Sequence, residues 1–157
     1  MTKKIYTARG RLSEDTSESY GPDRILLADG RFDTAWKVIS FRIFGASSGG
    51  NTTGDGMGKL ATSDNCETGP GDFFNADDSR EIAWSQNSAS LDSGAGGGFG
   101  EQIVDAANLV IEDLWVYARG VADSQDLNYV VELERHSIDE WQGALLMARD
   151  RASDVQR

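Results

Sequence analysis

Short patterns in this chain suggest catalytic chemistry, and the clearest of them is a serine motif. Gly45-Ala46-Ser47-Ser48-Gly49 matches G-x-S-x-G, in which a serine nucleophile lies on a sharp turn between a strand and a helix. The glycine-rich residues 49–54 are not expected to form that helix. A triad would also need His136, the single histidine of the chain, in an α/β framework that the sequence does not show. A hydrolase built on Ser47 therefore remains an alternative interpretation.

A second pattern looks like a phosphate-binding loop. It is Gly54-Asp55-Gly56-Met57-Gly58-Lys59. The pattern G-x-x-x-x-G-K-[ST], aligned on this lysine, needs glycine at position 53 and serine or threonine at position 60. The chain has Thr53 and Leu60 there, so the pattern fails twice and a turn is the preferred interpretation.

Metal ligands are present as residue types, but their spacing matches no known site. A typical zinc site takes several cysteine and histidine ligands, whereas His136 and Cys66 are single and distant in sequence. Aspartates in the expected loops could bridge calcium, but none falls in the EF-hand spacing, so a solvated acidic surface is preferred. They are Asp55, Asp64, Asp72, Asp77, Asp78 and Asp92. The sequence thus predicts no catalytic residue, no metal site and no cofactor.

Composition limits the class of protein further. The 157 residues are enough for one domain with a buried core. A net charge of -11 disfavours binding to nucleic acid or to an anionic membrane. The single cysteine, Cys66, excludes an internal disulfide. The first residues lack the apolar core of a signal peptide and no run is long enough to span a membrane, so we expect folding in a reducing cytoplasm.

Apolar alternation predicts a β body over residues 23–136. Residues 35–46 are expected to form a long strand with Ile39, Phe41 and Ile43 on one face. Residues 109–118 are apolar on both faces or bulged near Glu112-Asp113, and we place them in the middle of a sandwich. Residues 127–133 alternate cleanly and predict a strand with one buried face.

The two ends of the chain differ from this body. Residues 1–22 are polar and aperiodic, which predicts an arm that is flexible or becomes ordered on a neighbour. Ser137-Ile138-Asp139-Glu140 fits a capping box, so we expect an amphipathic helix over residues 137–153. Trp141, Leu145 and Ala148 lie on its apolar stripe. The predicted fold is mainly β: a single jelly-roll-like β-sandwich with one C-terminal helix.

Four tryptophans could form a platform on which sugars stack: Trp36, Trp84, Trp115 and Trp141. Each lies in an expected strand or in the helix stripe. We therefore interpret them as core residues.

The order of the apolar segments resembles that of small virion proteins of marine bacterial viruses, over roughly residues 24–152. The segments are WKVISFRIF (36–44), DSREIAW (78–84), LVIEDLWVY (109–117), LNYVVELE (127–134) and WQGAL (141–145). The resemblance implies a capsid-associated decoration, cement, vertex or spike-base subunit, made in the host cytoplasm and located in the virion. Its implied partners are other capsid proteins and copies of itself. The arm 1–22 and the helix 137–153 are the expected contact elements. No individual functional residue is carried over.

A carbohydrate- or receptor-binding β-sandwich is the alternative to this structural role. It would place two or more tryptophans and loop carboxylates on one exposed patch. An assembly subunit would instead form oligomers or bind capsids, so sedimentation of the isolated protein separates the two functions.

Overall fold

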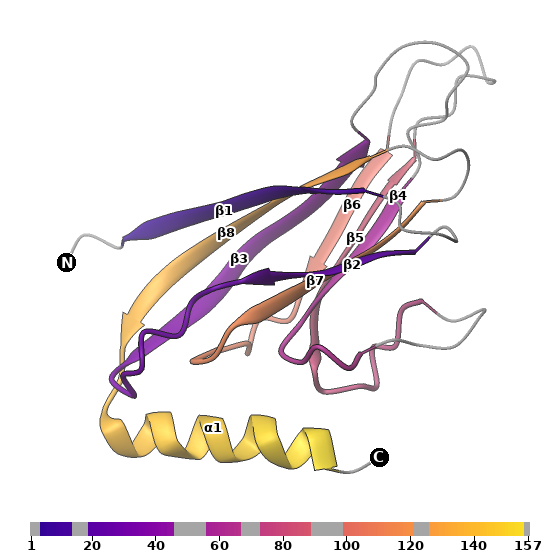
Figure 1. The fold of residues 1–157 in the computed structure, drawn as a ribbon. Helices are drawn as coiled ribbons and strands as arrows, with labels where there is room; N and C mark the ends of the chain where they lie inside the picture. Colours follow the sequence, from indigo (N-terminus) through magenta and orange to yellow (C-terminus); the bar gives the residue numbers. More distant parts are fainter. Residues whose placement is uncertain are drawn as a thin grey trace.

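The structure is a computed structural model that describes residues 4–13, 19–45, 56–66, 73–88, 99–120 and 126–155. Within these ranges the chain forms eight strands and one helix (Figure 1). They are β1 (Ile5–Leu12), β2 (Ser19–Ile25), β3 (Thr34–Gly45), β4 (Gly56–Ala61), β5 (Glu81–Ser88), β6 (Phe99–Val104), β7 (Leu114–Gly120), β8 (Leu127–Ser137) and α1 (Glu140–Val155). The predicted class, mainly β with a C-terminal helix, is confirmed.

The described strands form two antiparallel sheets in a sandwich-like arrangement. One is three-stranded in the order β1-β8-β3, and the other is five-stranded in the order β2-β7-β4-β5-β6. Helix α1 lies across one end of the two layers (Figure 1). The jelly-roll form of the sandwich stays a prediction.

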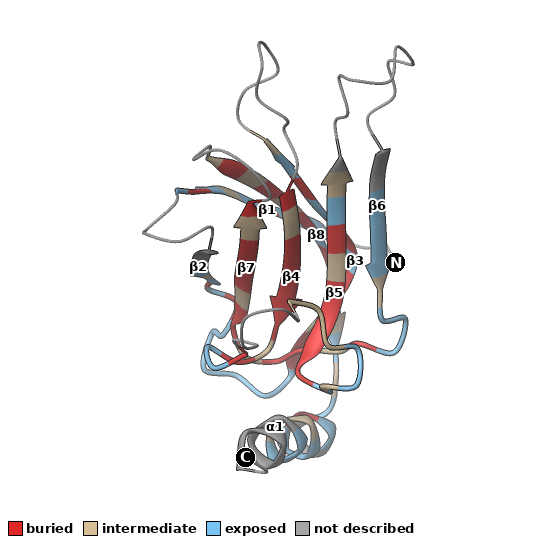
Figure 2. Ribbon diagram, turned by 90° about the vertical axis from the view of Figure 1, so that its right-hand side faces the viewer, coloured by how far each residue is buried: buried red, intermediate tan, exposed pale blue. Residues whose placement is uncertain are grey.

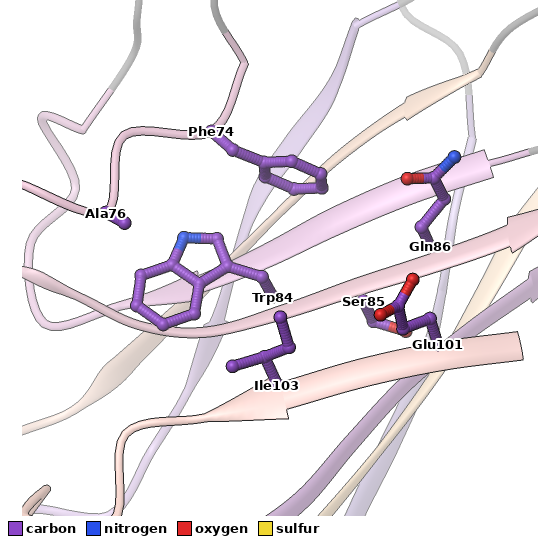
Figure 3. A pocket seen from close by; sticks show the side chains of 7 residues that line it. All are labelled: Phe74, Ala76, Trp84, Ser85, Gln86, Glu101 and Ile103. Carbon is purple, nitrogen blue, oxygen red and sulfur yellow. The ribbon is translucent and has the colours of Figure 1, made fainter.

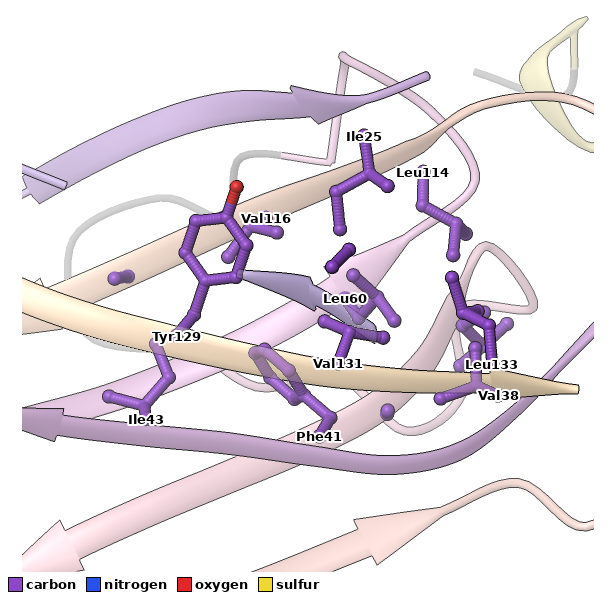
Figure 4. Packing of buried hydrophobic residues seen from close by; sticks show 14 of the residues in the cluster. Ile25, Val38, Phe41, Ile43, Leu60, Leu114, Val116, Tyr129, Val131 and Leu133 are labelled. Atoms are coloured by element: carbon purple, nitrogen blue, oxygen red, sulfur yellow. The ribbon is translucent and has the colours of Figure 1, made fainter. Parts of the chain in front are cut away.

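The inward faces of the sheets bury a large apolar core. In Figure 2, β4 and β7 are largely buried, whereas β6 and the described part of α1 are mostly exposed. Each large side chain removed from water contributes roughly 1.5–3 kcal/mol to the free energy of folding. Core residues from both sheets, shown in Figure 4, include Val38, Phe41, Leu60, Leu114, Val116, Tyr129, Val131 and Leu133.

The prediction for β8 is confirmed, and that for β7 needs correction. Alternate residues of β8 from Leu127 to Leu133 are buried, and β8 is the central strand of its sheet. The strand predicted over 109–118 is interrupted, because Val110 forms an isolated bridge and β7 begins at Leu114. β7 is apolar on both faces as expected, yet the middle strand of its sheet is β4.

Asp113 explains the irregularity expected at residues 112–113. Its carboxylate accepts hydrogen bonds from the Leu27 and Ala28 backbone N–H groups at 2.7 and 2.9 Å, and from the Arg24 guanidinium. Burial alone would raise the pKa of Asp113, but the Ala28 and Leu27 bonds and Arg24 outweigh it and lower the pKa. The carboxylate therefore fixes the connection that leaves β2.

The face predicted for Ile39 in β3 is wrong. The register with β8 shifts between Val38 and Ser40, so Ile39 is the extra residue of a bulge. Ile39 is 43% exposed, whereas Phe41 and Ile43 are buried. The bulge moves the inward face from even-numbered to odd-numbered positions.

The prediction of an N-terminal arm over residues 1–22 is also wrong where the structure describes it. β1 pairs with β8 along its whole length, and β2 pairs with β7. Only Ala8 and Leu12 of β1 are buried, so the strand lacks the apolar alternation that would have predicted it. Residues 1–3 and 14–18 lie outside the described residues.

Helix α1 begins later than predicted, and its N-cap is Asp139 rather than Ser137. Asp139 Oδ1 accepts the Gln142 N–H at 2.7 Å, while Ser137 ends β8. Leu145 is 53% exposed, so the expected apolar stripe does not reach the core there. The side chain of Trp141 lies outside the described residues. A close contact with the body occurs at Gly143, which packs against the Phe32 backbone.

Candidate functional site

The residues of the serine and metal hypotheses are not gathered into a site in the described structure. His136 lies at the end of β8 with Nε2 3.0 Å from Glu134 Oε1, and Ser47 lies outside the described residues. Among the described residues, no group of three or more histidine, cysteine, aspartate or glutamate side chains could hold a metal ion. Asp55, Asp72 and Asp92 also lie outside the described ranges.

Lys59, the lysine of the phosphate-loop-like segment, is buried in an ion pair on the outer side of the five-stranded sheet. Its Nζ lies 2.6 Å from Glu81 Oε1, and the two side chains are 1% and 0% exposed. The rings of Phe73 and Tyr117 lie 5.2 and 5.5 Å from the ammonium, within the range of a cation–π interaction. Lys59 is therefore inaccessible to a phosphate group, and its segment enters a strand.

Glu81 links this ion pair to a surface pocket. Its Oε2 accepts a hydrogen bond from the Trp84 indole N–H at 2.8 Å and another from the Asn75 backbone N–H at 2.9 Å. Asn75 follows Phe74 directly, so a single carboxylate holds the indole and the backbone beside the Phe74 ring. A buried charge needs such partners, because an unpaired carboxylate away from water is strongly destabilising.

The connection between β4 and β5 is held by further buried polar contacts. Arg80 binds both oxygens of Asp78 at 2.9 and 2.6 Å and donates to the Asn65 carbonyl at 2.9 Å. The Tyr117 hydroxyl accepts the Cys66 N–H at 3.1 Å. Burial raises the pKa of the Cys66 thiol to about 11, so this cysteine is protonated at neutral pH. These contacts therefore anchor the connection that carries Phe74.

The pocket opens on the outer face of β5 and β6 and has a volume of about 310 Å³ (Figure 3). In the strand register Trp84 pairs with Ile103, and Gln86 pairs with Glu101. These four side chains face outward because Ser85, between two of them, points inward and accepts the Ile43 N–H.

One side of the pocket is apolar and the other is polar. Figure 3 shows Phe74, Trp84 and Ile103 on one side and the head groups of Gln86 and Glu101 on the other. Ile103 is 58% exposed. The pocket thus offers apolar surface and hydrogen-bonding groups to the same ligand.

The prediction that the tryptophans are core residues is wrong for Trp84, which is half-buried on the outer face. Trp115 is half-buried on the same sheet, with the Arg24 guanidinium 5.3 Å from its ring, and Trp36 packs against the core.

Sequence reasoning also missed Glu81. The feature that could have identified it is a charged residue at the start of an apolar strand. Gln86 and Glu101 gave no signal, since only the pairing of β5 with β6 brings them together. Phe74 gave none either, because the hydrogen bond from the Asn75 backbone to Glu81 places it beside the pocket.

A different feature is the open edge of β1. The Arg135 N–H donates to the Lys4 carbonyl at 3.1 Å, which sets the phase of the β1–β8 ladder. By antiparallel alternation, the even-numbered residues of β1 exchange backbone hydrogen bonds with β8. The odd-numbered residues, including Thr7 and Arg9, direct their N–H and C=O groups away from the sheet.

The edges at β3 and β2 are protected, unlike that of β1. Outward N–H groups of β3 donate to side chains: Val38 to Asn108, Phe41 to Gln102 and Ile43 to Ser85, at 2.8, 3.1 and 3.1 Å. β2 carries Pro22 and a register shift, both of which discourage pairing. In the described part of the chain, no side chain bonds the outward backbone of β1 in this way.

Comparison with known protein families, curated proteins and solved structures gives no match to this chain. Among the described residues, no helix has the length and apolar character needed to cross a membrane.

Proposed function

We propose that this chain is a non-catalytic structural subunit of a virus particle, of the decoration, cement or vertex type, and that it assembles through the open edge of β1. The observation that carries the proposal is the uncovered backbone of β1, in contrast to the covered edge at β3 and the interrupted edge at β2. An uncovered edge strand is a ready template for another strand. The resemblance of the apolar segments to small virion proteins supplies the class of assembly.

The proposed occupant of this edge is β1 of a second copy. A two-fold antiparallel pairing through the outward residues places Thr7 opposite Arg9 of the second copy, and Ile5 opposite Arg11. No two arginines then lie directly opposite each other, which avoids the most unfavourable cross-strand contact. The pairing supplies about eight backbone hydrogen bonds and joins the two three-stranded sheets into one.

Charge limits the strength of this association. Each copy carries a net charge of -11, and the paired strands are both basic at Arg9 and Arg11. Both effects are repulsive and are screened by salt. About eight hydrogen bonds at roughly 0.5–1.5 kcal/mol each must also offset the entropy lost on association. We therefore expect a weak dimer that strengthens with ionic strength and is favoured where copies are concentrated on a shell.

The test is sedimentation velocity of the wild type and two variants over a range of concentrations. Thr7→Pro removes an outward N–H without breaking the pairing with β8, because proline is tolerated on an edge. Thr7→Ala is the matched control, since it shortens the side chain and keeps the N–H. We expect concentration-dependent dimers for the wild type and Thr7→Ala and a monomer for Thr7→Pro at unchanged melting temperature. A wild type that stays monomeric at all concentrations and salt levels, or a Thr7→Pro variant that dimerises normally, contradicts the proposal.

A further inference from the structure

We infer that the pocket formed by Phe74, Trp84, Ile103, Gln86 and Glu101, here called the Trp84 pocket, binds a sugar ring. This inference goes beyond the structural role and is independent of it, because it concerns β5 and β6 and not the edge of β1. It rests on the arrangement of the apolar and polar sides and on the way in which Glu81 holds the aromatic walls.

The apolar side suits the C–H face of a pyranose. The Trp84 indole N–H is bonded to Glu81 at 2.8 Å, so the carbon surface of the indole is left for the pocket. Ile103 lies beside Trp84 across the strand pair, and Phe74 completes this apolar side (Figure 3). An amphipathic ligand can place its C–H groups against these surfaces and remove them from water.

The polar side suits the hydroxyl groups of the same ring. The Gln86 amide donates and accepts hydrogen bonds, and the Glu101 carboxylate accepts them. These residues are directly paired between β5 and β6, so their head groups can bind neighbouring hydroxyls, which also both donate and accept. A quaternary ammonium would use the aromatic rings and the carboxylate, but it has no acceptor for the Gln86 N–H groups.

The walls of the pocket are held before any ligand arrives. Glu81 Oε2 accepts hydrogen bonds from the Trp84 indole N–H and from the Asn75 backbone N–H next to Phe74. The Lys59 ammonium neutralises the Glu81 carboxylate. Holding side chains in place before binding reduces the entropy lost on binding. The volume of about 310 Å³ is at the lower end of the range for small-molecule sites and suits a ligand of one or two rings.

Saturation-transfer difference NMR tests this inference with methyl pyranosides of glucose, galactose, mannose and N-acetylglucosamine as probes. Trp84→Ala removes the stacking surface. Ile103→Glu replaces an apolar lining surface with a carboxylate. Because Ile103 is 58% exposed, this variant should keep the fold even if Trp84→Ala does not. Phe44→Ala is the control, because it removes an exposed aromatic side chain from the other sheet. Choline chloride serves as the cationic comparison.

We expect saturation of the C–H protons of at least one pyranoside by the wild type and by Phe44→Ala. The signal should fall to background with Ile103→Glu, and with Trp84→Ala if that variant keeps the wild-type melting profile. The inference is overturned if the wild type saturates none of the sugars, if the signal survives in folded Ile103→Glu, or if choline alone binds. These outcomes leave the sedimentation test of β1 unaffected.

Discussion

The substitution Glu81→Gln tests the buried network under the Trp84 pocket. It would leave the ammonium of Lys59, which is 1% exposed at its side chain, without a counter-charge. Removing one partner of a buried ion pair costs about 3–5 kcal/mol. A domain of this kind has a free energy of unfolding of roughly 5–15 kcal/mol, so the loss is a large part of the total.

Lys59→Met should lower the free energy of unfolding less than Glu81→Gln does, because the charge that it leaves buried keeps its hydrogen-bond donors. The Glu81 carboxylate would keep the hydrogen bonds from the Trp84 indole and the Asn75 backbone N–H. Hydrogen bonds to a charged group contribute about 1.5–3 kcal/mol each. Because these hydrogen bonds stabilise the remaining carboxylate, we expect Lys59→Met to lower the free energy of unfolding by roughly 1–3 kcal/mol. The double variant should be more stable than Glu81→Gln alone, since it leaves no unpaired buried charge.

Urea unfolding followed by circular dichroism at neutral pH gives the free energies of unfolding of the wild type and the three variants. We expect the free energy of unfolding to be highest for the wild type, lower for Lys59→Met and lowest for Glu81→Gln. The double variant should have a higher free energy of unfolding than Glu81→Gln. The reasoning is refuted if Glu81→Gln lies within about 1 kcal/mol of the wild type, which is less than any uncompensated buried charge should cost. It is equally refuted if the double variant loses the sum of the two single losses.

Further predictions concern other parts of the fold. Because the folded pKa of Asp113 is lowered, its stabilisation should be full above its unfolded pKa of about 3.9 and disappear as the pH falls through the folded value. The stability gap between wild type and Asp113→Asn should therefore be constant at neutral pH and shrink in acid urea titrations. Gly143→Ala places a methyl group 2.1 Å from the Phe32 carbonyl oxygen, so hydrogen exchange should show a less protected α1 over an unchanged sandwich. The buried thiol of Cys66 should react with Ellman's reagent only at the rate of unfolding, and rapid reaction of the native protein would contradict its burial.

The sequence predicted elements whose burial follows one regular period. The alternation of β8 from Leu127 to Leu133 identified a strand with one buried face, as the structure shows. β1 was missed because an edge strand with exposed odd-numbered residues has little apolar alternation. The bulge at Ile39 depends on the register of β8, which no local pattern in β3 contains. Ser137 and Asp139 are both good N-caps, and pairing of Ser137 with Thr34 decided between them.

The candidate pocket was harder to predict than the fold. The apolar alternation around Trp84 is the same whether the outer face of β5 is covered by other elements or open to solvent. Sequence alone could therefore not place Trp84 outside the core. Glu81 and Lys59 lie on different strands, and only the pairing of β4 with β5 brings their charges together. Gln86 and Glu101 meet only through the register of β5 with β6.

The most direct measurement of the proposed assembly is amide hydrogen exchange along β1 as a function of protein concentration. The N–H groups of Tyr6 and Ala8 bond to β8 in the isolated subunit, so they should be protected at every concentration. Those of Thr7 and Arg9 point away from the sheet, so we predict fast exchange in dilute solution and protection that grows with concentration. Fast exchange of Thr7 and Arg9 at every concentration would contradict assembly through this edge.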